Sequence, residues 1–323
     1  MSKLVRPALL AALVAAAFSV QAQYSQYSQD HDARNGGRNS CESRDGKDGK
    51  YGKDGKDGGR WSDSLQVVGL TEDQRLICFN EKSPGEARTI GFVSGLMYGD
   101  VLVGIDYRVQ DKKLYGVSKT GGIYILDTGT ATATLVSQLT VQLEGTSFGV
   151  DFNPAADRLR IVSDTGQNLR HKLYSDIVGP VVTLKDDPLD YPPATPVNAI
   201  GPNALGVTGS AYTNNDLDPS TATTLYVLDT NLDQIALQSP PNDGTLAATG
   251  KLGVDAGLSA GFDIYSTVRD GITVEVQALA SLQTAAGASS LYSIKLPTGK
   301  ATSRGNFSSR NKVIDIAIPL DQL

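Results

Sequence analysis

The sequence is poor in the side chains that most enzymes use for catalysis. Its 323 residues include two histidines, two cysteines and one tryptophan. His31 lies in a polar N-terminal stretch, so a general base or a transition-metal site would depend on His171 alone. A single histidine beside the end of a predicted strand is typical of a surface residue, and we expect His171 there. Gly145–Gly149 matches G-x-S-x-G, but that motif needs a strand-to-helix turn and a histidine partner, which argues against a serine hydrolase.

Long apolar runs are missing after the N-terminus. The first 22 residues combine Lys3 and Arg6 with a short apolar run over Ala8–Val20, and they end on the small-x-small pattern Val20-Gln21-Ala22. This arrangement is typical of a secretory signal peptide. We therefore predict a signal peptide over residues 1–22 and an exported protein, periplasmic or extracellular. No later run approaches about 18 apolar residues, so no integral membrane segment is expected.

An excess of basic charge is absent as well. The chain has 29 basic and 35 acidic residues, and removal of Lys3 and Arg6 with the signal peptide leaves 27 and 35, a net charge of −8. Nucleic-acid binding needs clustered Lys and Arg, so this balance excludes nucleic acid as a partner. A protein, a glycan or a small-molecule ligand remains open as the partner, and a monomer is expected.

The two cysteines and the residues around the first of them form a separate N-terminal region. In an oxidising compartment Cys41 and Cys78 either form a disulfide or remain two thiols, and the sequence leaves both open. Residues 23–63 have almost no apolar side chains, so we predict a flexible, disordered low-complexity tail. Glycine recurs at every third position from Gly46 to Gly58, but proline, which a collagen triple helix uses, is missing there. A folded domain is predicted over residues 64–323.

Short alternating runs rich in β-forming residues make up this domain. They are visible in Leu65–Thr71, Arg75–Asn80 and Val101–Arg108, and no window of helical length has an apolar stripe of period 3.6. The pattern predicts an all-β fold.

The runs also repeat. GIDYRVQDKKLYGVSKTGGIYI (Gly104–Ile125) returns 45 residues later as GVDFNPAADRLRIVSDTGQNLR (Gly149–Arg170), and its opening strand recurs in weaker form at Gly209–Thr213 and Gly261–Tyr265. Units of four short strands at spacings of about 45 to 66 residues are typical of β-propeller blades.

The two ends of the domain indicate how many blades there are. Leu65–Phe92 is a unit without its opening strand, and Lys312–Leu320 is an opening strand without its unit. Pairing the two would close a ring and remove two exposed edges. We therefore predict a five-bladed β-propeller closed by the C-terminal strand. Six blades remain an alternative if the insert Asp186–Asn203 contains strands, and the repeat argues against a two-sheet sandwich.

The motif GIDYR…LYGVS…GGIYILDTGTAT, followed by GVDFNPAADRLRIVSDTGQNLR, resembles exported bacterial proteins grouped as domain-of-unknown-function family 4394. The resemblance extends over roughly Leu65–Leu320. It implies propeller-like repeats and export, and it implies no activity.

A recurring aspartate is the first candidate site. Asp106, Asp151, Asp263 and Asp315 occupy the same place in four opening strands. If they line the axis of the ring, their carboxylates could hold Ca²⁺, which prefers oxygen ligands. Alternatively, each carboxylate accepts backbone N–H groups of the next blade and locks the ring. Recurrence in blade after blade favours the second interpretation.

The second candidate is a polar cluster in the second copy of the repeat, where Arg160 replaces Tyr115 of the first copy and Gln167-Asn168 replaces Gly122-Ile123. It comprises Arg158, Arg160, Gln167, Asn168 and Arg170. Paired guanidinium groups bind carboxylates and other anions in a bidentate manner, so these residues are a candidate ligand clamp. Asp157 and Asp164 are near enough in sequence to neutralise the arginines, and ion pairing between blades is the alternative.

Two main hypotheses on function remain. The first is an exported, non-catalytic propeller that acts as a binding or scaffold module for an unknown ligand. The second is a Ca²⁺-dependent hydrolase of the lactonase or esterase type, in which the opening-strand aspartates hold the metal. A matrix component that associates through its tail is a third possibility. Enzymatic activity is therefore uncertain from the sequence, and Ca²⁺ is the one cofactor that the residues suggest.

Overall fold

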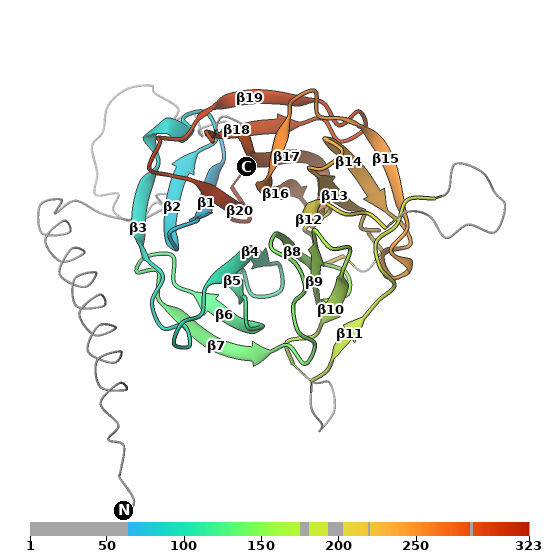
Figure 1. Cartoon of the computed structure of the whole chain (residues 1–323), viewed down its shortest axis with the longest axis horizontal. Helices are drawn as coiled ribbons and strands as arrows, with labels where there is room; N and C mark the ends of the chain where they lie inside the picture. Colours follow the sequence, from blue (N-terminus) through green and yellow to red (C-terminus); the bar gives the residue numbers. More distant parts are fainter. Residues whose placement is uncertain (1–63, 175–180, 193–202, 219, 285–286, 323) are drawn as a thin grey trace, which may run out of the picture. The chain divides into compact units, whose positions relative to one another are not determined.

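The computed structural model describes residues 64–174, 181–192, 203–218, 220–284 and 287–322. These residues form twenty strands and two short 3-10 helices, η1 (Pro84–Glu86) and η2 (Pro241–Asp243). The strands make five four-stranded antiparallel sheets arranged in a ring, which confirms the all-β prediction (Figure 1). The predicted signal peptide and tail lie outside the described residues, as does Cys41, so its disulfide with Cys78 stays a prediction.

Each sheet is one blade, and its first strand is the innermost one in Figure 1. Blade 1 consists of β20 (Val313–Ala317), β1 (Gln66–Thr71), β2 (Arg75–Asn80) and β3 (Arg88–Phe92). Blade 2 consists of β4 (Leu102–Arg108), β5 (Lys113–Ser118), β6 (Gly122–Leu126) and β7 (Ala133–Gln138). Blade 3 consists of β8 (Phe148–Asn153), β9 (Arg158–Ser163), β10 (Asn168–His171) and β11 (Thr183–Lys185). Blade 4 consists of β12 (Val207–Tyr212), β13 (Leu225–Asp229), β14 (Gln234–Gln238) and β15 (Leu246–Lys251). Blade 5 consists of β16 (Ala256–Arg269), β17 (Ile272–Thr284), β18 (Ser289–Ile294) and β19 (Ala301–Asn306).

The C-terminal strand closes the ring in the predicted way. β20 pairs antiparallel with β1, with Val68 opposite Ala317 and Leu70 opposite Asp315. Beyond β20 the Gln66 amide donates to Oε1 of Gln322 at 2.7 Å, which fastens the end of the domain to its beginning. The ring therefore has the five blades expected from the sequence. The insert contributes no sixth sheet within the described residues.

Burial falls from the inner strands to the outer ones, which explains the sequence pattern of each repeat. All six residues of β12 are buried, whereas most of β7 and β15 is exposed or half-buried. The core lies between neighbouring blades: one apolar cluster joins Leu70 of blade 1 to Leu102 and Ile105 of blade 2. Inner strands are apolar on both faces for this reason, and outer strands can carry Thr, Ser and Lys.

A glycine recurs in the opening strands of blades 2 to 5 for a steric reason, whereas β20 of blade 1 has Val313 at this place. A Cβ atom built on each of these glycines would lie within 2.7 Å of an atom of the next blade's inner strand. The distances are 2.4 Å from Gly104 to Cγ2 of Val150, 2.4 Å from Gly149 to the Ser210 amide, 2.7 Å from Gly209 to Cβ of Phe262 and 2.4 Å from Gly261 to Cα of Asp315. The inner strands thus approach backbone of the next blade at Gly149 and Gly261, and a side chain of the next blade at Gly104 and Gly209. Glycine fits because it has no side chain.

We expect Gly261→Ala to destabilise the domain by about 3 kcal/mol, because the added methyl group would overlap backbone atoms of Asp315 and Ile316 that cannot move independently of the ring closure. Urea denaturation measures the free energy of unfolding. Gly129→Ala is the matched control, since its new methyl group would meet only Oδ1 of Asp127, at 3.3 Å. Equal stability of the two variants would contradict the close-approach argument.

Candidate functional site

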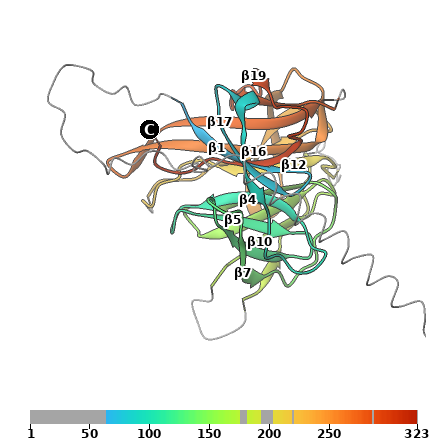
Figure 2. The same cartoon turned by 90° about the vertical axis from the view of Figure 1, so that its left-hand side faces the viewer.

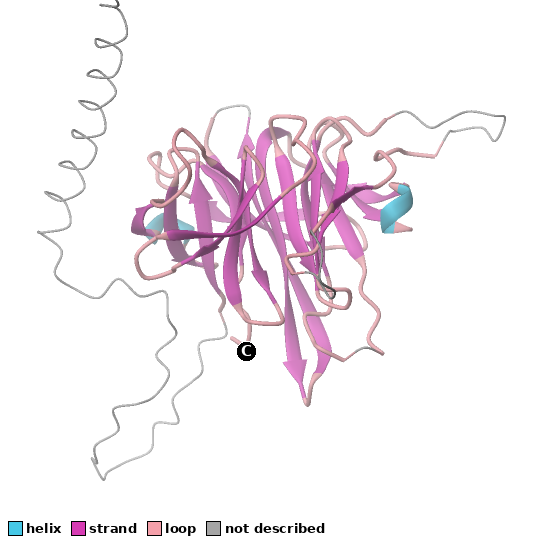
Figure 3. Ribbon diagram, turned by 90° about the horizontal axis from the view of Figure 1, so that it is seen from below, coloured by secondary structure: helices cyan, strands magenta, loops and turns pink. Residues whose placement is uncertain are grey.

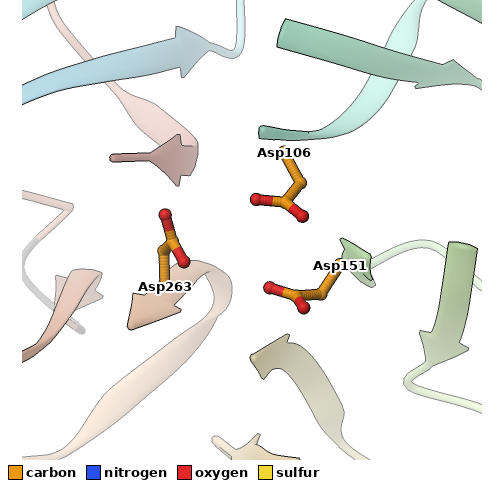
Figure 4. Close-up of side chains that lie close together, drawn as sticks. All are labelled: Asp106, Asp151 and Asp263. Carbon is orange, nitrogen blue, oxygen red and sulfur yellow. The ribbon is translucent and has the colours of Figure 1, made fainter. Parts of the chain in front are cut away.

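The four recurring aspartates lie on innermost strands of four blades. Asp106 is on β4, Asp151 on β8, Asp263 on β16 and Asp315 on β20, and each is between 4% and 6% exposed. The carboxylates of Asp106, Asp151 and Asp263 point into a common space between the inner strands, with one oxygen of each within 4.8 Å of the others (Figure 4). The structure therefore brings together residues that the sequence separates by more than 150 positions. We call these four side chains the axial aspartates.

Each axial aspartate accepts a backbone N–H of the next blade around the ring. The donors are Ile105 to Asp315 at 2.7 Å, Phe152 to Asp106 at 2.7 Å, Tyr212 to Asp151 at 3.1 Å and Ile318 to Asp263 at 2.6 Å. Blade 4 has Ala211 at this place, and there the Asn214 amide donates to Oγ of Ser266 at 3.0 Å. The recurrence of the aspartate in the sequence favoured hydrogen bonding between blades, and the structure contains these hydrogen bonds. They couple the five inner strands in sequence around the axis.

Burial gives these carboxyl groups unusual pKa values. Desolvation raises the pKa of Asp263 to about 6 and that of Asp315 well above its ordinary value. Desolvation also raises the pKa of Asp106 and Asp151 well above the ordinary range, and the neighbouring carboxylates add to the effect. Within the described residues, none of the ion pairs involves an axial aspartate. Burial therefore favours the protonated form of these carboxyl groups more than it is favoured in an exposed aspartate.

A calcium ion would need more from this cluster than its carboxylates. Ca²⁺ takes six to eight oxygen ligands, and the geometry offers one oxygen from each of three aspartates. Both oxygens of Asp106 and of Asp263 already accept backbone N–H groups. Carboxylate oxygens are suitable ligands for a hard cation, whereas the backbone N–H groups that they already accept indicate a structural role. A metal-binding role of the four axial aspartates stays a prediction.

The raised pKa values predict a pH dependence of stability with a definite sign. The folded state retains protons that the unfolded state loses above about pH 4, so the free energy of unfolding should fall as the pH rises from about 4 to 6 and beyond. Asp263 alone would account for about 3 kcal/mol. Asp263→Asn should flatten this slope, measured by urea denaturation between pH 4.5 and 7.5.

The exposed Asp255→Asn serves as the control, and it should leave the slope unchanged. Calcium provides a second arm of the same experiment. If the axial aspartates bind Ca²⁺, the metal would hold them ionised, and millimolar CaCl₂ should stabilise the protein and abolish the decline with pH. If the free energy of unfolding still declines with pH in CaCl₂, the result would support carboxyl groups that are protonated and hydrogen-bonded between blades.

Among the arginines of the blade 3 cluster, Arg160 is buried and Arg158 and Arg170 are half-buried. Arg160 is 3% exposed. Its guanidinium donates to Oδ2 of Asp186 at 2.7 Å, to Oδ1 of Asn168 at 2.6 Å and to Oδ1 of Asn242 at 2.8 Å. Asn168 in turn donates to the carbonyl groups of Asp187 and Pro241. Because residues 241–242 belong to the turn between β14 and β15, Arg160 and Asn168 tie blade 3 to blade 4.

The other three members of the predicted clamp also have protein partners. Arg170 donates to Oδ1 of Asp186 at 2.9 Å, Gln167 bonds to the backbone of Gln142 and Glu144, and Arg158 donates to the carbonyl groups of Ala156 and Asp157. The acid that neutralises Arg160 and Arg170 is therefore Asp186. Asp157 instead pairs with Arg108 of blade 2 at 2.7 Å, and Asp164 bonds to Thr146. Ligand binding by the five cluster residues stays a prediction.

The expectation of a surface position for His171 is wrong. The side chain is 1% exposed, with Nε2 at 2.9 Å from Oγ of Ser137 and Nδ1 at 3.0 Å from Oγ1 of Thr183. Burial lowers its pKa to about 4, so the ring is neutral near pH 7. The two hydroxyl groups belong to β7 and β11, and His171 thus joins the outer strands of two blades.

Gly145–Gly149 leads into strand β8, which confirms that it is no nucleophile elbow.

Arg160→Ala should destabilise the domain by about 3 kcal/mol, because it leaves Asp186 buried without its closest cation. Thermal and urea denaturation measure the loss. Arg158→Ala is the matched control on the same strand, and it should cost less than about 1 kcal/mol since it removes only hydrogen bonds to nearby carbonyl groups. If Arg160→Ala were as stable as the wild type, the guanidinium would be dispensable for folding. That outcome would favour the ligand clamp, in which Arg160 binds a ligand and has no structural role.

A cavity of about 490 Å³ opens among the segments that follow the innermost strands of four blades. It is lined by residues from segments 109–112 of blade 2, 215–218 of blade 4, 268–272 of blade 5 and 320–321 after β20. We call it the loop pocket. A second cavity, of about 620 Å³, is lined by residues 107–134 of blade 2 alone. The loop pocket is the better candidate because several blades converge on it.

The loop pocket combines exposed apolar side chains with acidic ones. Leu217 is 63% exposed and Ile272 is 52% exposed. Asp218, Asp270 and Asp321 also line the pocket, and its one basic residue, Lys112, forms an ion pair with Asp321. The result is an apolar surface with a net negative charge.

Asp216 fixes one wall of this pocket. Its Oδ2 accepts the Thr273 amide at 3.1 Å and the Thr273 hydroxyl at 2.8 Å, so the β12–β13 loop is held against the β16–β17 hairpin. Sequence reasoning missed the pocket because its residues come from four turns spread over more than 200 positions. The one local signal was the turn sequence NNDLDPS, which begins at Asn214.

The chain is a five-bladed β-propeller whose blades are joined by buried aspartates of the innermost strands. It belongs to the family described as Domain of unknown function (DUF4394), whose model matches residues 75–317. This match confirms the resemblance seen in the repeat. No protein among the curated ones matches the sequence. Within the described residues, no helix has the length and apolar character that crossing a bilayer requires.

Several solved structures are similar to this chain at low identity. An auxiliary nutrient binding protein from Bacteroides ovatus has a TM-score of 0.37 and 15% identity, over 59% of this chain and 48% of that one. A protein of the same description from Bacteroides thetaiotaomicron has a TM-score of 0.34 and 13% identity, over 69% and 55%. A protein of unknown function from Bacteroides thetaiotaomicron has a TM-score of 0.40 and 12% identity, over 81% and 68%. The chain spans about half the length of the two nutrient binding proteins.

Proposed function

We propose that this chain is an exported, non-catalytic propeller that acts as a binding or scaffold module. The loop pocket is its binding site, and the ligand is a small molecule or side chain that combines an apolar body with a positive charge. The single observation that carries this proposal is the exposure of Leu217 and Ile272 at an acidic cavity built from four blades. Apolar side chains that remain exposed beside a cavity are typical of binding surfaces.

The described polar groups support a binding role over a catalytic one. His171 is buried between two hydroxyl groups, and the arginines of blade 3 are paired with Asp186. The loop pocket holds carboxylates and one ion-paired lysine, which favour binding of a cation by charge. The predicted signal peptide over residues 1–22 supports export.

A metal-dependent hydrolase is the second candidate, favoured by one observation. Asp106, Asp151 and Asp263 each offer an oxygen within 4.8 Å of the others, as a shared cation would require. In this alternative the axial aspartates would hold Ca²⁺, and the metal would supply Lewis-acid activation of a bound ester or lactone. The calcium arm of the pH titration separates the two candidates.

Binding at the loop pocket can be tested with two small probes of matched size and opposite charge, phenethylammonium and phenylacetate. Phenethylammonium should bind at least about tenfold more tightly, because the acidic side chains attract it and repel the carboxylate. Ligand-observed NMR titration measures both dissociation constants. Equal affinity for the two probes, or none for either, would refute the assigned ligand class.

Two variants locate the site. Leu217→Ser should weaken binding of phenethylammonium, since it removes exposed apolar surface from the pocket, whereas Leu232→Ser changes a leucine of 41% exposure in a turn outside the pocket and should have no effect. Asp218→Asn should reduce the preference for the cationic probe. Because Leu217 and Leu232 are exposed, both serine variants should fold normally.

A further inference from the structure

The hairpin formed by β16 and β17 extends beyond the rest of its blade. β16 has 14 residues and β17 has 13, whereas β18 and β19 have six each. The hairpin projects past the other blades in Figures 2 and 3. Among the described strands β18 pairs with β17 only over Ala278–Gln283, so the segment Ile272–Gln277 pairs with β16 alone, and its Thr273 amide and hydroxyl donate to Asp216 of blade 4.

The open edge of this segment is apolar and exposed. Ile272, Val274 and Val276 are 52%, 56% and 38% exposed, and Glu275 is the one charged residue among the six. Unpaired strand edges expose backbone N–H and C=O groups that pair readily with another strand, and proteins usually protect them with proline, several charges or a covering loop. The sequence ITVEVQ has high β-propensity and no proline. We call Ile272–Gln277 the β17 edge.

We propose that the β17 edge binds the β17 edge of a second copy of this chain, antiparallel and across a two-fold axis that passes beside Val274. This inference goes beyond the binding function proposed above and replaces the expectation of a monomer. In a two-fold arrangement the same surface serves both partners, so the edge must be complementary to itself.

The register centred on Val274 makes the edge self-complementary. Val274 then faces its symmetry mate, and Ile272 faces Val276 of the second copy, so all three exposed apolar side chains gain cross-strand apolar neighbours. Thr273 faces Glu275 of the second copy. The two Glu275 side chains therefore do not oppose one another.

Charge at the ends of the edge supports the same register. β18 ends at Ile294, which pairs with Ala278, and the exposed Lys295 follows it. In this register the hairpin tip of the second copy lies beside Gln277, at the end of β18. It would bring the exposed Asp270 next to Lys295. Two such acid–base contacts, related by the two-fold axis, would flank the paired strands.

Reciprocal charge substitutions at the two-fold axis test the pairing. In sedimentation velocity and light scattering at about 100 µM, the full chain should be dimeric. Val274→Glu and Val274→Lys should each raise the dimer dissociation constant at least about 100-fold, because each variant opposes two like charges. An equimolar mixture of the two variants should restore the dimer as a heterodimer, which also shows that both variants are folded.

Leu232→Ser is the control, since this exposed leucine lies in the turn between β13 and β14, outside both the loop pocket and the β17 edge, and it should leave the dimer intact. A monomeric wild-type chain would overturn the proposal. It would also be overturned by a Val274→Glu variant that remains dimeric, or by a variant mixture that remains monomeric. A monomer whose amides over residues 272–277 resist hydrogen exchange would assign the edge to another segment of the same chain.

Discussion

The fold depends on the contact between neighbouring inner strands. In blades 2 to 5 a glycine lets the inner strand approach that of the next blade, and in four of the five blades a buried carboxyl group accepts an N–H of the next blade. A buried backbone N–H without a hydrogen-bond partner destabilises the folded state. The aspartates provide partners for N–H groups that strand pairing within a blade does not satisfy. The same bonds fix the angle between blades and hence the number that closes the ring.

This arrangement gives the axial aspartates a chemistry that differs from their surface counterparts. Desolvation raises the pKa values of Asp106, Asp151 and Asp263, and neighbouring carboxylates add to the effect for Asp106 and Asp151, which favours protons at a place where a metal-binding protein would hold a cation. Asp315 shares this environment on the closing strand, where its carboxyl group accepts the Ile105 amide of blade 2. Ring closure and axial electrostatics are therefore parts of one structural feature.

The rigid ring leaves adaptable surface mainly at its turns. Blade 3 uses Arg160, Asn168 and His171 to join its neighbours, so the polar residues that distinguish it from blade 2 serve the packing of the ring. Blade 5 uses its extra residues to lengthen one hairpin. The exposed apolar side chains include Leu217 on the β12–β13 loop and three residues of the β16–β17 hairpin, and the proposals for ligand and partner binding rest on these.

The sequence by itself determined the strand pattern, the repeat, the five blades and the ring closure. These features follow from the period-two alternation of apolar and polar residues and from the Gly-x-Asp sequence of the opening strands, because both patterns are local and recur along the chain. It also placed Asp106 and its three counterparts in equivalent positions. Only the tertiary structure decided that Asp186 neutralises Arg160, that His171 is buried, and that Leu217, Ile272 and Asp321 share a cavity. Such contacts join different blades, and their partners depend on the angle and spacing between sheets, which no local pattern encodes.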